Sequence, residues 1–254
     1  MSEDQKLSTE NQLKLTEKQY SSWFDTPYYH ILYKERNYRE AQIFMDNLTH
    51  YLNLPENAKV LDLACGKGRH SIYLNQLGFT VLGADLSENS IAEANKNANE
   101  TLHFKVHDMR EPFEEKFDAI FNLFTSFGYF EDEADNLKTL IAIKDSLSET
   151  GFAVIDFMNV NQVIETLVPE EVKTVDQIEF HIKRYVKEGH IYKEISFQDQ
   201  GQNYHFTEKV RAFSLQDFQE LMDEAGIYLL DIFGDYKLKK FHKTDSERLI
   251  MIFK

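Results

Sequence analysis

The chain has 254 residues, a formal net charge of −15, 42% hydrophobic residues and 28% charged residues. This composition excludes a disordered polar chain, and no apolar run approaches the ~20 residues of a membrane span. The acidic balance argues against a nucleic-acid backbone as the main partner, because phosphate binding needs a basic face. Cys65 is the only cysteine, and the first residues lack the pattern of a secretory signal. We therefore expect a protein of the reducing cytoplasm.

Aromatic side chains are concentrated near the start of the chain, in residues 20–38. We expect Pro27 to interrupt any helix in this segment, because proline lacks the N–H that a helix interior uses. Apolar residues of 39–53 recur with a period near 3.6, which predicts an amphipathic helix. We treat residues 1–38 as an N-terminal segment that precedes the main fold.

From residue 59 onward, short apolar runs alternate with helical patterns. The predicted strands are 60–64, 79–84, 102–106, 117–123, 152–157, 227–233 and 247–253. Ser87 and Ser214 are suited to cap two of the helices. Such an alternation predicts an α/β fold with a doubly wound, mostly parallel, Rossmann-like sheet that helices cover on both faces.

Residues 170–212 do not follow this alternation. Apolar residues there alternate with polar ones in about three runs, separated by the turn-like segments 187–190 and 199–202. We predict an inserted antiparallel β ribbon that divides the α/β core into 39–169 and 213–254. An exposed ribbon of this kind either roofs an active site or pairs with a second copy to form a homodimer.

The segment 60–70 predicts a ligand site, because a strand runs into a turn with Gly66 and Gly68 before a helix begins. Small residues let a ligand approach the backbone, and a helix N-terminus offers free N–H groups. Asp62, Asp85 and Asp108 stand at the carboxyl ends of three successive predicted strands. Asp85 is placed to accept hydrogen bonds from ribose hydroxyls, and Asp108 from an exocyclic amine.

Two other nucleotide sites share part of this pattern. A dinucleotide site, as in a nicotinamide-dependent reductase, favours glycine where this chain has Ser71, and a carboxylate such as Asp62 would repel a pyrophosphate. A phosphate-binding loop needs Gly-Lys-Ser/Thr after a four-residue spacer, which is missing. A phosphate-free ligand with a positive charge suits the acidic surroundings better.

The motifs resemble those of class I S-adenosylmethionine-dependent methyltransferases over roughly residues 38–160. Asp62-Leu-Ala-Cys-Gly-Lys-Gly is similar to their first motif, and Asp85 to their ribose-binding acid. The resemblance implies a seven-strand sheet whose last strand is antiparallel, and S-adenosylmethionine as the cofactor. The cofactor-binding residues that it implies in this core are Asp62, Ala64, Cys65, Gly66, Gly68, Asp85, Leu86, Asp108, Met109, Asn122, Leu123 and Phe124. His70 stands where the family usually has a small residue, so the helix entry is bulkier.

In the resembling family, the segment before the first strand folds over the cofactor. The resemblance therefore implies that aromatic rings of this segment cap the sulfonium through cation–π attraction, and the candidates are Trp23, Tyr28, Tyr29 and Tyr33. The alternative is that these rings are ordinary core aromatics. Arg69 either pairs with a carboxylate of the cofactor or substrate or lies on the surface.

The candidate catalytic residues are Tyr29, His70 and Tyr129, and no metal site is expected. His70 is a possible general base, and Tyr129 follows the fourth strand at the edge where open α/β sheets bind ligands. We expect methyl transfer to a small-molecule acceptor by in-line attack in a closed pocket. Two alternatives stay open: an RNA or protein methyltransferase that uses a basic cluster (Lys237, Lys239, Lys240, His242 and Lys243), or a non-catalytic cofactor-binding module.

Overall fold

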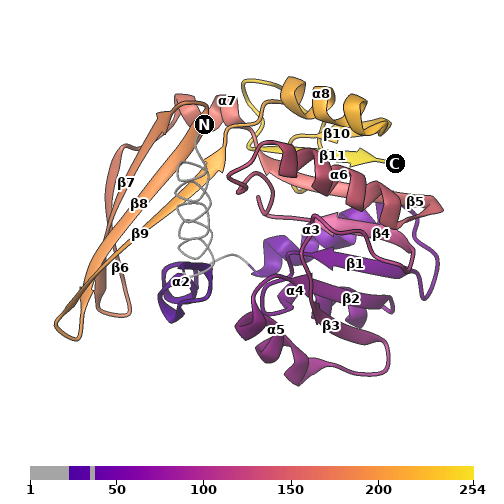
Figure 1. Ribbon diagram of the computed structural model, residues 1–254, viewed down its shortest axis with the longest axis horizontal. Helices are drawn as coiled ribbons and strands as arrows, with labels where there is room; N and C mark the ends of the chain where they lie inside the picture. The colour runs from indigo at the N-terminus through magenta and orange to yellow at the C-terminus, as the bar shows by residue number, and fades with distance from the viewer. Residues whose placement is uncertain (1–22, 35–37) are drawn as a thin grey trace, which may run out of the picture. The chain divides into compact units, whose positions relative to one another are not determined.

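The computed structural model describes residues 23–34 and 38–254 (Figure 1). The chain forms two compact units. Of the described residues, the larger unit contains 38–166 and 213–254, and the smaller unit contains 23–34 and 167–212. The first residues of the aromatic-rich segment 20–38, Tyr20 among them, lie outside the described residues.

The larger unit contains a seven-stranded sheet with the strand order β10-β11-β5-β4-β1-β2-β3. The strands are β1 (Lys59–Leu63), β2 (Thr80–Asp85), β3 (Leu102–Val106), β4 (Phe117–Asn122), β5 (Leu147–Met158), β10 (Leu229–Phe233) and β11 (Arg248–Phe253). Strands β1 to β5 pair in parallel, and β11 runs antiparallel to both β5 and β10. This confirms the predicted Rossmann-like sheet with an antiparallel last strand.

Helices cover both faces of this sheet (Figure 1). They are α3 (Tyr38–Tyr51), α4 (Arg69–Gln76), α5 (Glu88–Ala94), α6 (Ala134–Ser146) and α8 (Leu215–Ala225), with a 3₁₀ turn at Asn95–Asn97; a short helix, α7 (Val160–Glu165), follows β5. On one face Phe44 of α3 packs in a cluster with Val60 and Ile250, while on the other Phe218 of α8 packs against Phe157. Burial on both faces explains why the strands are almost continuously apolar.

The predicted helix caps are present. The Ser87 hydroxyl accepts a hydrogen bond from the Ser90 N–H at 2.9 Å at the start of α5. Ser214 and Asp217 form a reciprocal capping box at the start of α8, which ends at Gly226 in the left-handed conformation. These local signals give α5 and α8 defined first residues and so fix how the preceding loops leave the sheet.

The smaller unit contains an antiparallel sheet of four strands, one more than the sequence suggested. They are β6 (Glu170–Val175), β7 (Ile178–Lys187), β8 (His190–Asp199) and β9 (Gln202–Arg211), in that order. The turn between β6 and β7 is Asp176-Gln177, with φ of 49° and 68°. Strand β6 was missed because this turn contains no glycine and the strand itself is mostly polar and exposed.

Pro27 interrupts the helical structure of this segment, as predicted: residues 23–24 are helical, residues 25–26 form a turn and a bend, and a new helix begins at Pro27. Pro27 is the first residue of α2 (Pro27–Leu32), and the Thr26 side chain caps the helix by accepting from the Tyr29 N–H at 3.1 Å. Proline is well tolerated at this position, because the N–H of the first helical residue has no intrahelical partner. Leu32 of this helix packs with Trp23 in the core of the smaller unit.

Candidate functional site

Three acidic residues lie along one edge of the larger unit's sheet. Strands β1, β2 and β3 are neighbours and parallel, so their carboxyl ends lie at the same edge. Asp62 is the fourth residue of β1, Asp85 ends β2, and Asp108 follows β3 by two residues. The structure thus brings the predicted acids to one edge, and each has a different set of partners within the protein.

A tight turn connects β1 to α4. Ala64, Gly66 and Gly68 have φ of 65°, 55° and 78°, and the Gly68 N–H donates to the Cys65 carbonyl at 3.0 Å. The Cys65 N–H donates to the Ala84 carbonyl at 3.0 Å, which joins the turn to β2. The Cys65 N–H is thus used within the protein. Burial raises the pKa of the Cys65 thiol, so it is not a nucleophile near neutral pH.

The two glycines of this turn serve different purposes. A Cβ atom on Gly68 would lie 2.5 Å from the Phe104 ring and 3.2 Å from the Ala94 Cβ, so glycine there allows close packing. A Cβ atom on Gly66 would meet no atom within 4 Å. The backbone at Gly66 therefore faces open space, which is the condition for a ligand to approach it.

Asp62 is buried and holds the turn to the helix that follows. Its carboxylate accepts a 2.6 Å hydrogen bond from the hydroxyl of Ser71, which is also fully buried in α4. Burial raises the pKa of Asp62 to about 6, although the hydrogen bond from Ser71 favours the ionised form. Serine is therefore required at this position of α4 as a donor to Asp62, where a dinucleotide site would have glycine.

Asp85 connects two loops at the sheet edge. One carboxylate oxygen accepts the Gly66 N–H at 2.8 Å, and the other accepts the Ser87 N–H at 2.9 Å. Asp85 is half-buried, and Leu86 beside it is 62% exposed. The carboxylate that the sequence assigned to the ribose thus also holds the glycine turn in position.

Asp108 pairs with a residue that the sequence analysis did not single out. Arg110 donates from Nε to Asp108 Oδ1 at 3.0 Å and from a terminal nitrogen to Oδ2 at 2.6 Å. A second terminal nitrogen of Arg110 bonds Asp135 at 2.7 Å. Burial opposes the charge of Asp108, but Arg110 holds the pKa of this carboxyl below its usual value. Arg110 lies two residues from Asp108 in the sequence, and this spacing was the available signal.

The end of β4 contributes a buried amide to the same edge. The Asn122 side chain is 1% exposed and donates to the Leu63 carbonyl of β1 at 3.1 Å. Its Oδ1 has no hydrogen-bond partner within the described part of the chain. Since a buried acceptor is normally paired, this oxygen is suited to receive a donor from a ligand.

The His70 ring of α4 stacks on Phe124 in the loop after β4, and Arg69 contacts both His70 and Tyr38 of α3. The His70 ring lies on the Phe124 ring with centroids 4.5 Å apart and an interplanar angle of 24°. Arg69 donates from Nε to His70 Nε2 at 2.9 Å, and its guanidinium lies 4.9 Å from the centre of the Tyr38 ring. His70 would therefore have to give up this hydrogen bond to take a proton at Nε2.

The four predicted N-terminal aromatics pack within the smaller unit. Trp23 is 1% exposed and donates to Glu208 at 2.7 Å, and Tyr33 donates to the same oxygen at 2.8 Å. Tyr28 donates to Asp199 at 2.8 Å, and Tyr29 lies edge-on to Trp23 at 5.7 Å. These contacts give each ring a packing role, and their contact with a cofactor stays a prediction.

The remaining predicted residues lie in the larger unit, and their roles stay predictions. Met109 and Tyr129 are half-buried, and Leu123 is buried. Tyr129 is among the groups that act electrostatically on Arg248 of β11. Within residues 23–34 and 38–254 no group of side chains could hold a metal ion, and no helix is long and apolar enough to cross a membrane.

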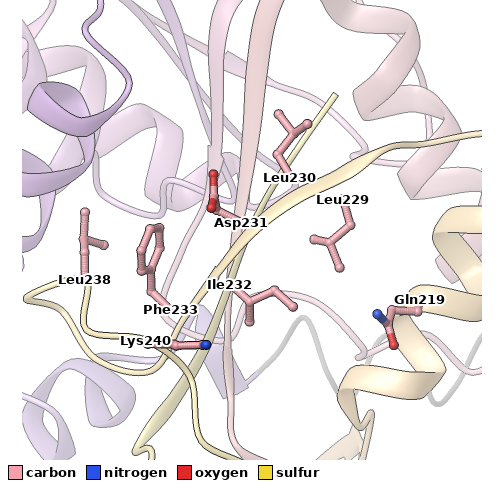
Figure 2. A pocket seen from close by; sticks show the side chains of 8 residues that line it. All are labelled: Gln219, Leu229, Leu230, Asp231, Ile232, Phe233, Leu238 and Lys240. Atoms are coloured by element: carbon pink, nitrogen blue, oxygen red, sulfur yellow. The ribbon is translucent and has the colours of Figure 1, made fainter.

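A groove of about 660 Å³ lies elsewhere on the larger unit, along the edge strand β10. Figure 2 shows the side chains that line it: Gln219, Leu229, Leu230, Asp231, Ile232, Phe233, Leu238 and Lys240. The sheet order places β11, β5 and β4 between β10 and β1. This groove is therefore separate from the Gly66 turn.

The residues at the β1–β4 edge fit the cofactor that the sequence resemblance implies. The space in front of Gly66 admits a ligand, and the surrounding acids suit a cationic, phosphate-free nucleoside. The Asn122 oxygen beside this edge is a buried acceptor without a partner in the described part of the chain. Asp62, Gly66, Asp85 and Asn122 are the residues best placed to hold such a group or to shape its site.

Comparisons with known proteins agree with this assignment. Residues 60–151 match the family model described as a methyltransferase domain. The chain is 32% identical over 199 residues to a glycine/sarcosine N-methyltransferase of Parasynechococcus marenigrum, covering 73% of this chain and 68% of that protein. It is 27% identical over 235 residues to a glycine/sarcosine N-methyltransferase of Aphanothece halophytica, covering 88% and 84%.

Solved structures show the same fold. A crystal structure of an S-adenosylmethionine-dependent methyltransferase from Clostridium acetobutylicum superposes with a TM-score of 0.75 at 23% identity. The match covers 89% of this chain and 95% of that one. Taken with the glycine turn, the strand-end acids and the sequence relatives, this shows that the chain belongs to the class I S-adenosylmethionine-dependent methyltransferases.

Proposed function

We propose that this enzyme methylates a small molecule at an amine nitrogen. The observation that carries the proposal is the edge at Asp85, whose half-buried carboxylate favours cationic ligands over polyanions. The names of the relatives support it, since the proteins from Parasynechococcus marenigrum and Aphanothece halophytica are both described as glycine/sarcosine N-methyltransferases.

S-adenosylmethionine supplies a methyl group bound to a sulfonium. The chain's contribution is to bind this cofactor, to align the acceptor and to exclude water. Asp85 and the Gly66 turn would hold the nucleoside, and the Asn122 carbonyl oxygen would accept a hydrogen bond at the amino-acid end. Alignment alone supplies on the order of 7–11 kcal/mol of the barrier in favourable cases.

A protonated amine acceptor must first lose a proton, because its nitrogen needs a lone pair to attack the methyl carbon; the bond from that carbon to the sulfonium sulfur breaks as the new bond to nitrogen forms. His70, Tyr29 and Tyr129 are the proposed groups for this proton or for orienting the acceptor. His70 is the best defined of the three, because Phe124 and Arg69 fix its ring. His70 can take the proton at Nε2 only after the hydrogen bond from Arg69 to this nitrogen is broken.

Transfer of a labelled methyl group tests the proposal. The purified chain would be incubated with methyl-labelled S-adenosylmethionine and with glycine, sarcosine or other small amines, alongside matched alcohols and thiols. We expect label only in an amine, and less of it with the Asp85→Ala variant when the cofactor is below saturation. Labelling of an alcohol or thiol would contradict the choice of nitrogen, and cofactor binding without any turnover would favour a non-catalytic module.

The RNA or protein alternative depends on the basic cluster at 237–243. There Lys239 pairs with Asp235 at 3.6 Å, and Lys240 lines the groove at β10. Binding of RNA through this cluster would weaken steeply with salt. We expect no retention of RNA at physiological ionic strength, and labelled RNA or protein in an extract would contradict the small-molecule proposal.

Pairing of two copies through the inserted sheet stays a prediction. Its edge strand β6 exposes Val172 to 57%, and an unprotected edge can accept another strand. Light scattering coupled to size exclusion would test it, with Val172→Lys as the variant. A dimer that Val172→Lys dissociates would support the pairing, and a monomeric wild-type chain would refute it.

A further inference from the structure

We propose that Asp156 is a positioning residue for methyl transfer, because it holds the loop after β4 in the conformation that places Phe124 and His70. The inference rests on the proposed role of these residues in the site. Asp156 itself is 0% exposed and lies near the end of β5. It therefore acts through the residues to which it bonds.

The loop after β4 contains two consecutive residues in the left-handed backbone conformation. Phe124 and Thr125 have φ of 58° and 61°, a region that residues with a Cβ rarely occupy, especially when they are β-branched. Asp156 bonds both of their amides. Its Oδ2 accepts the Phe124 N–H at 2.8 Å, and its backbone carbonyl accepts the Thr125 N–H at 3.0 Å.

A buried cation fixes Asp156 in turn. Arg248 of β11 donates from Nε to Asp156 Oδ1 at 2.7 Å and from a terminal nitrogen to the Thr125 hydroxyl at 2.9 Å. The Tyr236 hydroxyl donates to Asp156 Oδ2 at 3.3 Å. Arg248 therefore contacts both the anchor and the anchored loop, and the network leaves the carboxylate one geometry in which all donors are satisfied.

Asp156 affects the site by determining the position of the Phe124 ring. This ring stacks on His70, lies edge-on to Phe44 at 6.1 Å and has the Arg69 guanidinium 5.8 Å from its centre. If Phe124 leaves the left-handed region, its ring must leave the stack. His70 then loses the surface that orients it, and the cofactor edge at Asn122 is disturbed.

The test combines a ring signal with cofactor affinity. In the full chain with labelled histidine, stacking on Phe124 should displace the His70 ring resonances, and Asp156→Asn should remove that displacement. We expect the dissociation constant of S-adenosylhomocysteine to rise about tenfold in this variant. Asp231→Asn is the matched control, since Asp231 is an exposed carboxylate on β10, and it should change neither readout.

A second substitution separates positioning from a loss of stability. Glycine occupies the left-handed region without strain, so Thr125→Gly added to Asp156→Asn should restore part of the His70 displacement and of the affinity. Failure of this rescue, or an unchanged His70 signal in Asp156→Asn, would overturn the proposal. If Asp156→Asn does not fold, Arg248→Lys provides the test, because it keeps the charge but removes the bond to Thr125. None of these readouts depends on the acceptor, so their failure is distinguishable from an error in the proposed function.

Discussion

The Ser71 hydroxyl donates a 2.6 Å hydrogen bond to the buried carboxylate of Asp62, which ties the first turn of α4 to β1 beneath the cofactor edge. Burial raises the pKa of Asp62 from 3.8 to about 6. The folded state thus binds this proton more tightly than the unfolded state. Ionisation of Asp62 therefore lowers the free energy of unfolding. This loss is absent below the pKa of the unfolded state, grows as pH rises and is complete above the pKa of the folded state.

The stability of the Asp62→Asn variant should therefore increase relative to that of the wild type as pH rises from about 4 to 7. The amide oxygen can still accept from Ser71, and the variant carries no charge. The difference in unfolding free energy should shift by on the order of 3 kcal/mol over this range. Urea unfolding of both proteins at several pH values measures it, with Asp231→Asn as control. A difference that does not vary with pH would refute the raised pKa.

Asp85→Ala should weaken S-adenosylhomocysteine binding by about 1–3 kcal/mol. The carboxylate has two roles in this structure, because it is the predicted ribose acceptor and also holds the Gly66 N–H. Isothermal titration measures the loss. Asp231→Ala should bind normally, and unchanged affinity in Asp85→Ala would remove the assignment of the ribose site.

Substitutions at Gly66 should mainly weaken cofactor binding, whereas a substitution at Gly68 should mainly lower the stability of the fold. The Cβ of Gly66→Ala points into open space, so the fold should persist at a cost of about 1 kcal/mol for the positive φ, while cofactor binding falls. Gly66→Val should abolish binding. Gly68→Ala places its Cβ against Phe104 and should chiefly lower the melting temperature. Thermal melting and cofactor titration of each variant separate the two effects, and normal binding by Gly66→Val would rule out the turn as the binding surface.

Trp23, the only tryptophan, reports on the smaller unit. Its ring lies 4.7 Å from Phe206, and its N–H bonds Glu208, so its emission should be blue-shifted and should red-shift on unfolding. We expect S-adenosylhomocysteine to leave this emission unchanged, because the ring is in a packed core. A saturable change with cofactor would instead support the contact predicted for Trp23 from the sequence. The Trp23→Phe variant, which has no tryptophan, measures the background emission.

The sequence by itself determined the α/β core and the position of the cofactor edge. Continuous apolar runs such as 60–64 and 152–157 can only be buried on both faces, and Ser87 and Ser214 mark helix starts by a local hydrogen bond. The acids at 62, 85 and 108 could be placed at one edge because parallel strands align their carboxyl ends. Local signals were weaker for β6, because its sequence is polar and the turn that follows it contains no glycine.

Only the tertiary structure decided what each acid does. Asp62 bonds Ser71 nine residues away, and Asp108 pairs with the nearby Arg110. Asp156, in contrast, forms an ion pair with Arg248, which is distant in the sequence. An aspartate within the apolar strand 152–157 was visible, but its partner lies 92 residues further along the chain. Buried charges must be paired, and sequence order does not say with what. Pairing depends on which strands become neighbours, and the sheet order that sets this emerges only when the whole core is packed.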